Sequence, residues 1–269
     1  MTTQPPRWTL VTVTFNSETD LQEYWSGFSS SDDVQWIVVD NASSDRSPDL
    51  AESLGARVIR LPKNLGFGGA NNVGFFASQS HYVAFVNPDV QVKTETLPLL
   101  EKVIDETNGL VAPQLLNPDG SPQPNGRGAP YLLNKVLHRL KPERLNGAYR
   151  LFADVGQRID VDWVIGAAVA GSRARLKKLG PWDDHFFVYY EDSDLGLRNQ
   201  LDGHRSVVLG DARWVHGWAR ETTSFRLAPW ILEFKSMAKF YARYPRLLGW
   251  PSNRDSASKS SAAEPLKTS

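Results

Sequence analysis

The sequence predicts an α/β fold, in which helices flank one mostly parallel sheet. Two observations support this prediction. In the first half of the chain, segments typical of strands alternate with segments typical of helices. The strand segments are apolar along their whole length rather than at every second residue, as expected for a parallel sheet that is covered on both faces. Ligands of such open sheets bind beyond the carboxyl ends of the strands, so polar residues at those ends are the first candidates for a site.

The expected elements of the first half follow from its hydrophobic pattern. The expected strands cover residues 8–17, 34–40, 56–62 and 81–90. The expected helices lie in residues 17–28, 47–55, 64–79 and 94–107, and the third is preceded by a glycine-rich loop. Ser17 is a candidate N-cap of the first helix. Pro48 and Gly55 stand where a helix favours proline at its start and glycine after its end.

The second half is less regular. Residues 121–150 are rich in Pro, Gly and Arg and are interpreted as a long excursion or mobile flap. Apolar segments return at 161–218, and an amphipathic helix is expected at 228–250. The low-complexity stretch 251–269 is expected to be disordered.

Composition narrows the functional classes. Thirty basic and thirty acidic residues cancel, which argues against a nucleic-acid partner. The chain has no cysteine, so disulfides and thiolate metal sites are excluded and a cytosolic location is expected. The start of the sequence has no pattern of a signal peptide. No apolar run approaches the roughly 20 residues that cross a bilayer, so a soluble or membrane-surface protein is expected.

Three polar residues, Asn16, Asp40 and Asp89, end predicted strands and should converge on one crevice. Asn-Pro-Asp occurs twice. Residues 117–119 precede a glycine and are typical of a β-turn. Residues 87–89 continue into extended chain, where Asp89 is well placed to hold a hard divalent cation. The alternative role for Asp89 is to cap the helix that follows.

A second acidic cluster contains Glu191, Asp192 and Asp194, directly after the apolar run FFVYY. Acidic residues in a first helical turn can be purely structural, because the helix dipole favours them. Crowded carboxylates, however, raise one pKa toward the range of a general base. Farther along, His216 ends another apolar segment. A lone histidine is more often structural, but this one could also be a second ligand of a cation at Asp89.

The segment NLGFGGANN, residues 64–72, matches neither the dinucleotide fingerprint nor the P-loop. Its glycines allow close approach of a backbone, and the N-terminus of the helix it opens favours anions. The alternative is a tight connection between a strand and a helix.

Taken together, these motifs resemble the family 2 inverting glycosyltransferases, and within them the bacterial rhamnosyltransferases that use dTDP-L-rhamnose. The similarity runs from Val11 to Trp218. It is carried, in order, by VTVTFNS, VVDNASSD, NLGFGGANN, VNPDV, VDWVIGAA and FFVYYEDSDLGLR…GHRSVVLGDARWVHGW.

The resemblance implies a GT-A fold, a nucleotide-sugar donor and Mg²⁺ or Mn²⁺. Residues 1–250 would form one domain, with a nucleotide-binding half at about 8–118 and an acceptor and catalytic half at about 160–250. The implied donor-binding residues are Thr14, Asn16, Asp40, Asn64, Gly66, Asn71, Asn87 and Asp89, with Asn72 on the same helix as Asn71. Asn87 and Asp89 replace the family's commoner Asp-x-Asp, so the metal would be held by Asp89 with His216. Asp192 would be the catalytic base, with Glu191 or Asp194 as the fallback.

The implied reaction transfers a sugar, best matched by L-rhamnose, to a glycan or polyprenyl-diphosphate-linked acceptor in cell-envelope polysaccharide synthesis. Two alternatives are a sugar nucleotidyltransferase and a non-catalytic protein that binds nucleotide sugars or glycans. A nucleotidyltransferase would need a basic, glycine-rich loop after the first strand, where this chain has TFNSETD. The helix at 228–250 either packs on its own domain or lies on the inner face of the plasma membrane through its basic residues.

Overall fold

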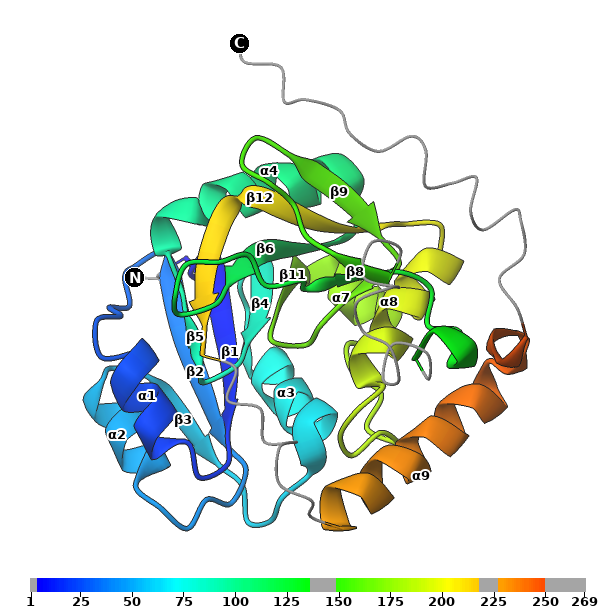
Figure 1. The fold of residues 1–269 in the computed structure, drawn as a ribbon. Coiled ribbons are helices and arrows are strands. Elements are labelled where there is room, and N and C mark those ends of the chain that lie inside the picture. The colour runs from blue at the N-terminus through cyan, green and yellow to red at the C-terminus, as the bar shows by residue number, and fades with distance from the viewer. Residues whose placement is uncertain (1–3, 136–148, 218–226, 250–269) are drawn as a thin grey trace.

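The computed structural model describes residues 4–135, 149–217 and 227–249, and Figure 1 shows their arrangement. The predicted tail at 251–269 lies outside these ranges. So do Trp218 and residues 136–148 of the predicted excursion.

One large sheet forms the centre of the molecule. Its order is β3-β2-β1-β4-β11-β6-β12-β5, with β9 paired to β12. The strands are β1 (Trp8–Thr14), β2 (Val34–Asp40), β3 (Arg57–Arg60), β4 (Tyr82–Val86), β5 (Val90–Gln91), β6 (Leu110–Leu116), β9 (Arg158–Val161), β11 (Ala168–Ser172) and β12 (Ser206–His216). Six of these nine strands run in one direction, and β5, β9 and β11 run against them. The prediction of a mostly parallel sheet is confirmed.

A small antiparallel sheet lies beside the large one, in the order β10-β7-β8. Its strands are β7 (Gly126–Arg127), β8 (Arg150–Leu151) and β10 (Trp163–Val164). Two of them fall inside the Pro- and Gly-rich excursion expected at 121–150. The flanks of that excursion are therefore ordered parts of the fold.

Helices cover both faces of the large sheet (Figure 1). They are α1 (Glu18–Tyr24), α2 (Ser47–Ser53), α3 (Gly66–Ala77), α4 (Leu97–Thr107), α7 (Arg173–Leu179), α8 (Glu191–Leu201) and α9 (Leu227–Arg243), with 3₁₀ turns η1 (Thr94–Thr96) and η3 (Pro245–Leu248). Successive residues of a strand point to opposite faces, so Leu10 packs in the core with α1, α2 and α4. Val11 packs in the core with α3, α7 and α8. Both faces of these strands are therefore buried under helices, which explains why the strands are apolar along their whole length, as inferred from the sequence.

One local prediction is confirmed in part. Ser17 occupies the N-cap position of α1, and its carbonyl accepts from the Leu21 amide at 3.0 Å. Its side chain makes no capping hydrogen bond, and its hydroxyl accepts from the Phe15 amide at 3.3 Å instead.

Another local prediction needs correction. The glycine-rich segment is not a loop, since α3 begins at Gly66 and includes its glycines. Farther along the helix, Gly74 lets α3 lie directly on β1, because a Cβ there would stand 2.3 Å from Val11 Cγ1.

The expected difference between the two Asn-Pro-Asp segments is not seen, because both form a turn. Around Asp119 the Gly120 amide donates to the Asn117 carbonyl at 2.8 Å, with Gly120 at φ +82°. Around Asp89 the Val90 amide donates in the same way to the Asn87 carbonyl at 3.2 Å, and the chain then enters β5. The two aspartates differ in exposure, since Asp119 is exposed and Asp89 is half-buried.

Helix α9 packs on the body of the protein with one face. Phe240 and Tyr241 are buried, Ser236 Oγ donates to the Val188 carbonyl at 2.8 Å, and the Tyr241 hydroxyl donates to the Pro130 carbonyl at 3.0 Å. Packing on the domain is thus confirmed for this face. In the described ranges no helix is both long and apolar enough to cross a membrane.

Candidate active site

The loops that follow β1 and β2 are tied together by polar side chains. Thr14 and Asp40 are register partners at the ends of these strands, and Thr14 Oγ1 donates to Asp40 Oδ1 at 3.1 Å. The other Asp40 oxygen accepts from the Ser43 amide at 3.2 Å. Asn16, in a left-handed conformation at φ +56°, accepts from the Ser44 amide at 2.7 Å. These bonds tie together the loops that follow β1 and β2, which form the rim of the crevice expected from the sequence.

Asn41, which the sequence analysis did not single out, joins this rim to α3. Its side-chain amide donates to Asn64 Oδ1 at 2.9 Å, and its Oδ1 accepts from the Leu65 amide at 2.8 Å. Asn64 Oδ1 also accepts from the Gly66 amide at 2.8 Å. Asn41 is a polar residue directly after a buried strand, and this position was the signal that could have identified it. The sequence analysis attributed that signal to the neighbouring Asp40.

The start of α3 contacts the loop that precedes α8. Gly66 has φ +78°, and a Cβ at this position would lie 2.3 Å from the Phe187 carbonyl oxygen. The next amide, of Phe67, donates to that same oxygen at 2.8 Å. Only glycine combines this backbone angle with so close an approach. Gly66 therefore holds the two halves of the protein together at the site.

Two asparagines of α3 have internal partners. Asn71 is 1% exposed, and its amide donates to the Phe67 carbonyl at 3.0 Å. Asn72 exchanges two hydrogen bonds with the backbone of Trp182, at 2.7 and 3.0 Å. Because its side chain is buried and used within the helix, Asn71 is a structural residue here, and we leave it out of the proposed donor site.

Asp89 and His216 meet at the ends of β4 and β12. Asp89 Oδ2 lies 3.3 Å from His216 Nε2, and the Gly217 amide donates to the Asp89 carbonyl at 2.8 Å. The other ring nitrogen, Nδ1, is 2.6 Å from Gln123 Oε1. An amide oxygen can only accept, so Nδ1 donates this hydrogen bond, and in a neutral imidazole the nitrogen with the lone pair is then Nε2, next to Asp89.

This arrangement fits a divalent cation. A carboxylate oxygen and an imidazole nitrogen are brought together, and a second polar residue binds the other ring nitrogen, as is usual for a metal-bound histidine. Gln123 was not predicted, since nothing in the sequence relates it to a histidine 93 residues away.

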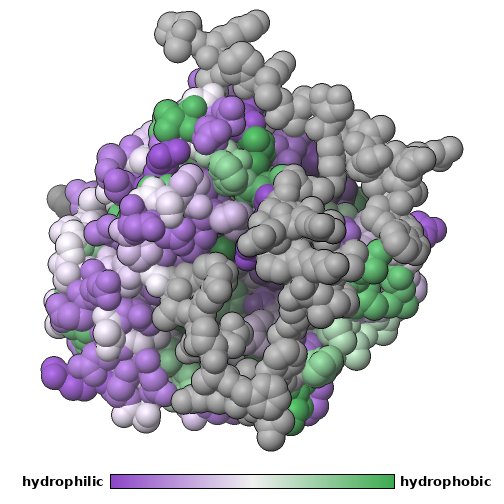
Figure 2. All heavy atoms as spheres, viewed as in Figure 1, coloured by the Kyte–Doolittle hydropathy of each residue, from purple (hydrophilic) through white to green (hydrophobic). Residues whose placement is uncertain are grey.

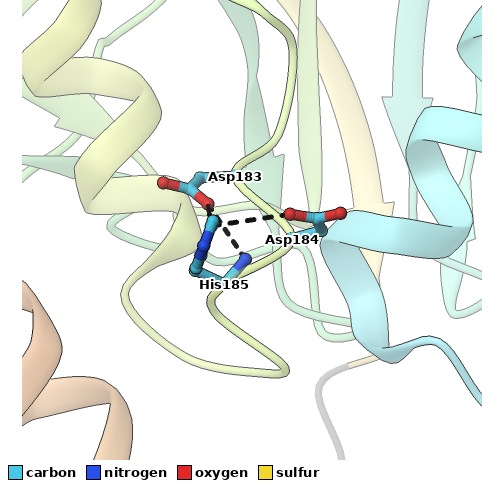
Figure 3. A group of neighbouring side chains, drawn as sticks. All are labelled: Asp183, Asp184 and His185. Carbon is cyan, nitrogen blue, oxygen red and sulfur yellow. Dashed lines mark hydrogen bonds and ion pairs between the residues drawn. The ribbon is translucent and has the colours of Figure 1, made fainter.

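A second group of potential ligands, Asp183, Asp184 and His185, lies on the loop before α8 (Figure 3). His185 Nδ1 is 2.8 Å from Asp183 Oδ1 and 3.6 Å from Asp184 Oδ1. The Asp183 carboxylate is also paired with Arg243. His185 and Asp184 are largely exposed, so we interpret this group as surface ion pairs and assign no cation to it.

The carboxylates of α8 follow a strained stretch of backbone. Tyr189 and Tyr190 have φ of +68° and +71°, a conformation that costs free energy for residues with a Cβ. The strain turns the chain so that α8 begins with Glu191 and Asp192 beside a cavity of about 430 Å³.

The first two carboxylates of α8 differ in their surroundings. Glu191 is buried, and its Oε2 has no hydrogen-bond partner among the described residues. Burial, reinforced by the charge of Asp192, raises the pKa of Glu191 to about 8. Asp192 accepts from the Ser193 amide at 2.7 Å and from the Gly166 amide at 3.4 Å. Burial also raises the pKa of Asp192, against the effect of these donors and of nearby cations.

Asp194 has a different role. It is fully buried and is bound by Arg198 Nε at 2.7 Å, Arg243 Nη1 at 2.9 Å and the Tyr244 hydroxyl at 2.8 Å. Both oxygens are held by these partners, Oδ2 by Arg198 and Oδ1 by Arg243 and Tyr244, so neither is open to a substrate hydroxyl. The fallback of Asp194 as the base is therefore not supported, and the residue instead clamps α9 and the turn after it onto α8.

The cavity beside Glu191 and Asp192 is lined in part by four aromatic side chains from distant parts of the chain. They are Tyr149, Trp163, Tyr189 and Tyr190, accompanied by the cationic side chains of Arg127 and Lys135. None of these six residues was predicted, because they come together only through the small sheet and the turn before α8.

Residues 166 and 167 connect the two sides of the site. The Asn87 amide donates to the Ala167 carbonyl at 2.8 Å, while the Gly166 amide faces Asp192. The residues at the end of β4 and the carboxylates at the start of α8 are thereby brought next to one another. A ligand that spans this junction would contact both.

Comparison with known proteins identifies the class. The model of glycosyl transferase family 2 matches residues 9–162, more than half of the chain, so the protein belongs to this family. Its fold is the GT-A fold, as the similar solved structures also have. The predicted fold class and family are confirmed.

Among its relatives is the N-acetylglucosaminyl-diphospho-decaprenol L-rhamnosyltransferase of Mycobacterium tuberculosis, which is 28% identical over 79% of this chain and 76% of the relative. The low-salt glycan biosynthesis hexosyltransferase Agl10 of Haloferax volcanii is 26% identical over 70% of this chain and 60% of its own length.

Two solved structures show the similarity of the fold. The mannosyltransferase PcManGT of Pyrobaculum calidifontis, in complex with GDP-Man and Mn²⁺, has a TM-score of 0.59 at 17% identity, over 94% of this chain and 67% of that one. The structure of residues 1–349 of S. aureus TarS in complex with UDP-GlcNAc has a TM-score of 0.54 at 18% identity, over 82% of this chain and 62% of that one. This chain thus spans less than two thirds of that TarS structure.

Proposed function

We propose that the protein is an inverting glycosyltransferase that moves L-rhamnose from dTDP-L-rhamnose to a hydroxyl of a glycan or polyprenyl-diphosphate-linked acceptor in cell-envelope polysaccharide synthesis. The observation that carries this proposal is the position of Asp192, on the cavity and joined through residues 166 and 167 to the end of β4. The choice of sugar rests on the mycobacterial relative.

The donor would lie at the carboxyl ends of β1, β2 and β4. We propose Thr14, Asn16, Asp40, Asn64, Gly66, Asn87 and Asp89 as its contacts. Since Thr14 and Asp40 are buried and bonded to each other, their main effect would be to hold the rim in shape for the nucleotide.

Asp89 and His216 would hold Mg²⁺ or Mn²⁺. The fit rests on the His216 tautomer fixed by Gln123 and on the partly exposed Asp89 carboxylate. When bound, the ion would neutralise charge on the leaving diphosphate.

Asp192 would act as the general base. Its carboxylate would take the proton from the acceptor hydroxyl as that oxygen forms a bond with the anomeric carbon. The bond from this carbon to the nucleoside diphosphate breaks on the opposite side, which inverts the configuration. Glu191, with a pKa of about 8, would be mainly protonated at neutral pH and leave Asp192 as the charged member of the pair. The aromatic walls of the cavity would stack against the acceptor sugar.

The base is tested with Asp192→Asn, which should bind dTDP as the wild type does and lose transfer by at least ~10²-fold, because proton transfer is removed without loss of shape. Transfer from dTDP-L-rhamnose and the thermal shift on adding dTDP are the measurements. Asp160→Asn, an exposed position on β9, is the matched control. A variant that loses dTDP binding but keeps near-normal transfer would refute the assignment.

The outer face of α9 would contact an anionic membrane surface. Ile231 and Phe234 are 52% and 55% exposed, Leu248 follows in η3 at 53%, and Lys235 is exposed beside them. Figure 2 shows apolar side chains gathered on the side of the molecule formed by α9 and the turn after it. Apolar side chains with flanking lysines suit the boundary between acyl chains and anionic head groups.

A further inference from the structure

Lys135 places a half-buried cation near the proposed base. Its ammonium lies 3.6 Å from the centre of the Tyr190 ring and 5.2 Å from that of Trp163. It also donates a hydrogen bond to Ser193 Oγ at 3.3 Å. A lysine held against two aromatic faces at the wall of a cavity is costly to desolvate, so its position calls for a reason beyond packing.

Ser193 connects this cation to Asp192. The side chain of Ser193 is fully buried, its amide donates to Asp192 Oδ1 at 2.7 Å, and its Oγ lies 3.4 Å from the same oxygen. A hydroxyl that accepts from an ammonium keeps its own proton for another acceptor. Ser193 Oγ can therefore accept from Lys135 and donate to Asp192 at once.

Other charged groups also face this carboxylate. Arg127 is nearby, but its guanidinium already donates to the carbonyls of Pro124 and Gly126. Glu191 and Asp194 belong to the same helix as Asp192. Tyr149, just before β8, faces Asp192, and Glu233 on α9 faces Lys135. Of the cations Lys135 and Arg127, only Lys135 donates a hydrogen bond to a side chain within the described residues, that of Ser193, which in turn contacts Asp192.

We propose that Lys135 is a positioning residue for the transfer reaction, which orients the Asp192 carboxylate through Ser193 and keeps it anionic. The inference rests on the proposed role of Asp192 as the base. It adds a function for the segment that follows β7, which otherwise forms only the wall of the cavity.

The effect on pH dependence has a defined sign. A cation lowers the pKa of a neighbouring carboxylate, so removal of Lys135 should raise the pKa of Asp192. A base works only when ionised, and the acid limb of the pH–rate profile should therefore move to higher pH, by roughly one unit for an opposite charge at this range. Burial lowers the pKa of Lys135 itself to about 8, so its support should weaken above that pH.

The direct test is a carbon-13 NMR titration of protein labelled at the aspartate carboxyl groups, with the Asp192 signal assigned from Asp192→Asn. Lys135→Met and Lys135→Gln should both raise the Asp192 pKa, and Lys135→Arg should restore it toward the wild type. The control Lys178→Met removes an exposed lysine that is bound to Asp202. This control should leave the pKa of Asp192 unchanged. Using two neutral variants guards against one that fails to fold, which a melting curve would reveal.

The pH–rate profile of transfer from dTDP-L-rhamnose gives the functional readout, and its acid limb should follow the titration. An unchanged Asp192 pKa in both neutral variants, or equal shifts in Lys178→Met, would overturn the role of Lys135. If Asp192→Asn keeps its transfer activity, the proposed base is wrong. If Asp192→Asn is inactive while the Lys135 variants titrate normally, the inference on Lys135 alone is wrong.

Discussion

His216 illustrates what a single residue needs before it has a chemical role. In the sequence it is a histidine between tryptophans, for which a structural role is the more common one and a metal site the alternative. In the fold its Nδ1 is fixed by Gln123 and its Nε2 faces Asp89 at 3.3 Å. The three residues come from β12, from the segment after β6, and from the end of β4. Their meeting gives His216 a defined tautomer and therefore a defined ligand atom.

We expect His216→Ala to weaken the binding of Mn²⁺ in the presence of dTDP by at least tenfold, because it removes one of two protein ligands. Gln123→Leu should weaken it by about tenfold, as is typical when the partner of a ligating histidine is lost. Isothermal titration calorimetry measures both. His81→Ala, at an exposed position, serves as the control. Unaltered Mn²⁺ affinity in both variants would show that the ion binds elsewhere.

Helix α9 shows how one element can combine two surfaces. Its inner side is anchored by Phe240, Tyr241 and the Arg243 link to Asp194. Its outer side carries Ile231 and Phe234 in solvent. The sequence posed packing and membrane contact as alternatives, whereas the structure leaves room for both, because the two sets of residues lie on different sides of the helix.

The double substitution of Ile231 and Phe234 by Ser should reduce binding to vesicles of phosphatidylglycerol and phosphatidylcholine by about tenfold or more, since each apolar side chain loses on the order of 1 kcal/mol of transfer free energy. Sedimentation at low salt is the measurement. Leu201→Ser, at a position on α8 that is 76% exposed, is the matched control. If the wild-type protein does not sediment with these vesicles, the membrane contact must be abandoned.

At the scale of the whole molecule, function depends on how the two halves meet. Residues 166 and 167 contact both the residue that follows β4, in the proposed donor half, and the start of α8, in the proposed acceptor half. Gly66 adds a second junction through Phe187. A transferase requires this proximity, because its base must reach an acceptor oxygen that is already close to the anomeric carbon of the donor.

A panel of dTDP-, UDP- and GDP-sugars should therefore single out one donor, and dTDP-L-rhamnose is expected to raise the melting temperature most. The same donor should be hydrolysed slowly by water in the presence of Mg²⁺ or Mn²⁺. Thermal shift and release of the nucleoside diphosphate are the two readouts. A larger shift with a UDP- or GDP-sugar would change the proposed donor, and binding without any turnover would favour a non-catalytic protein.

The sequence alone determined the alternation of strands and helices, the parallel part of the sheet and the polar residues Asn16, Asp40 and Asp89 that follow or end its strands. These features are local, because the apolar pattern of each segment fixes its burial. Only the tertiary structure separated Asp192 from Asp194 and supplied Gln123, Lys135 and the aromatic cavity. Such roles depend on partners far away in the chain, and no local pattern records which distant side chain will satisfy a buried charge.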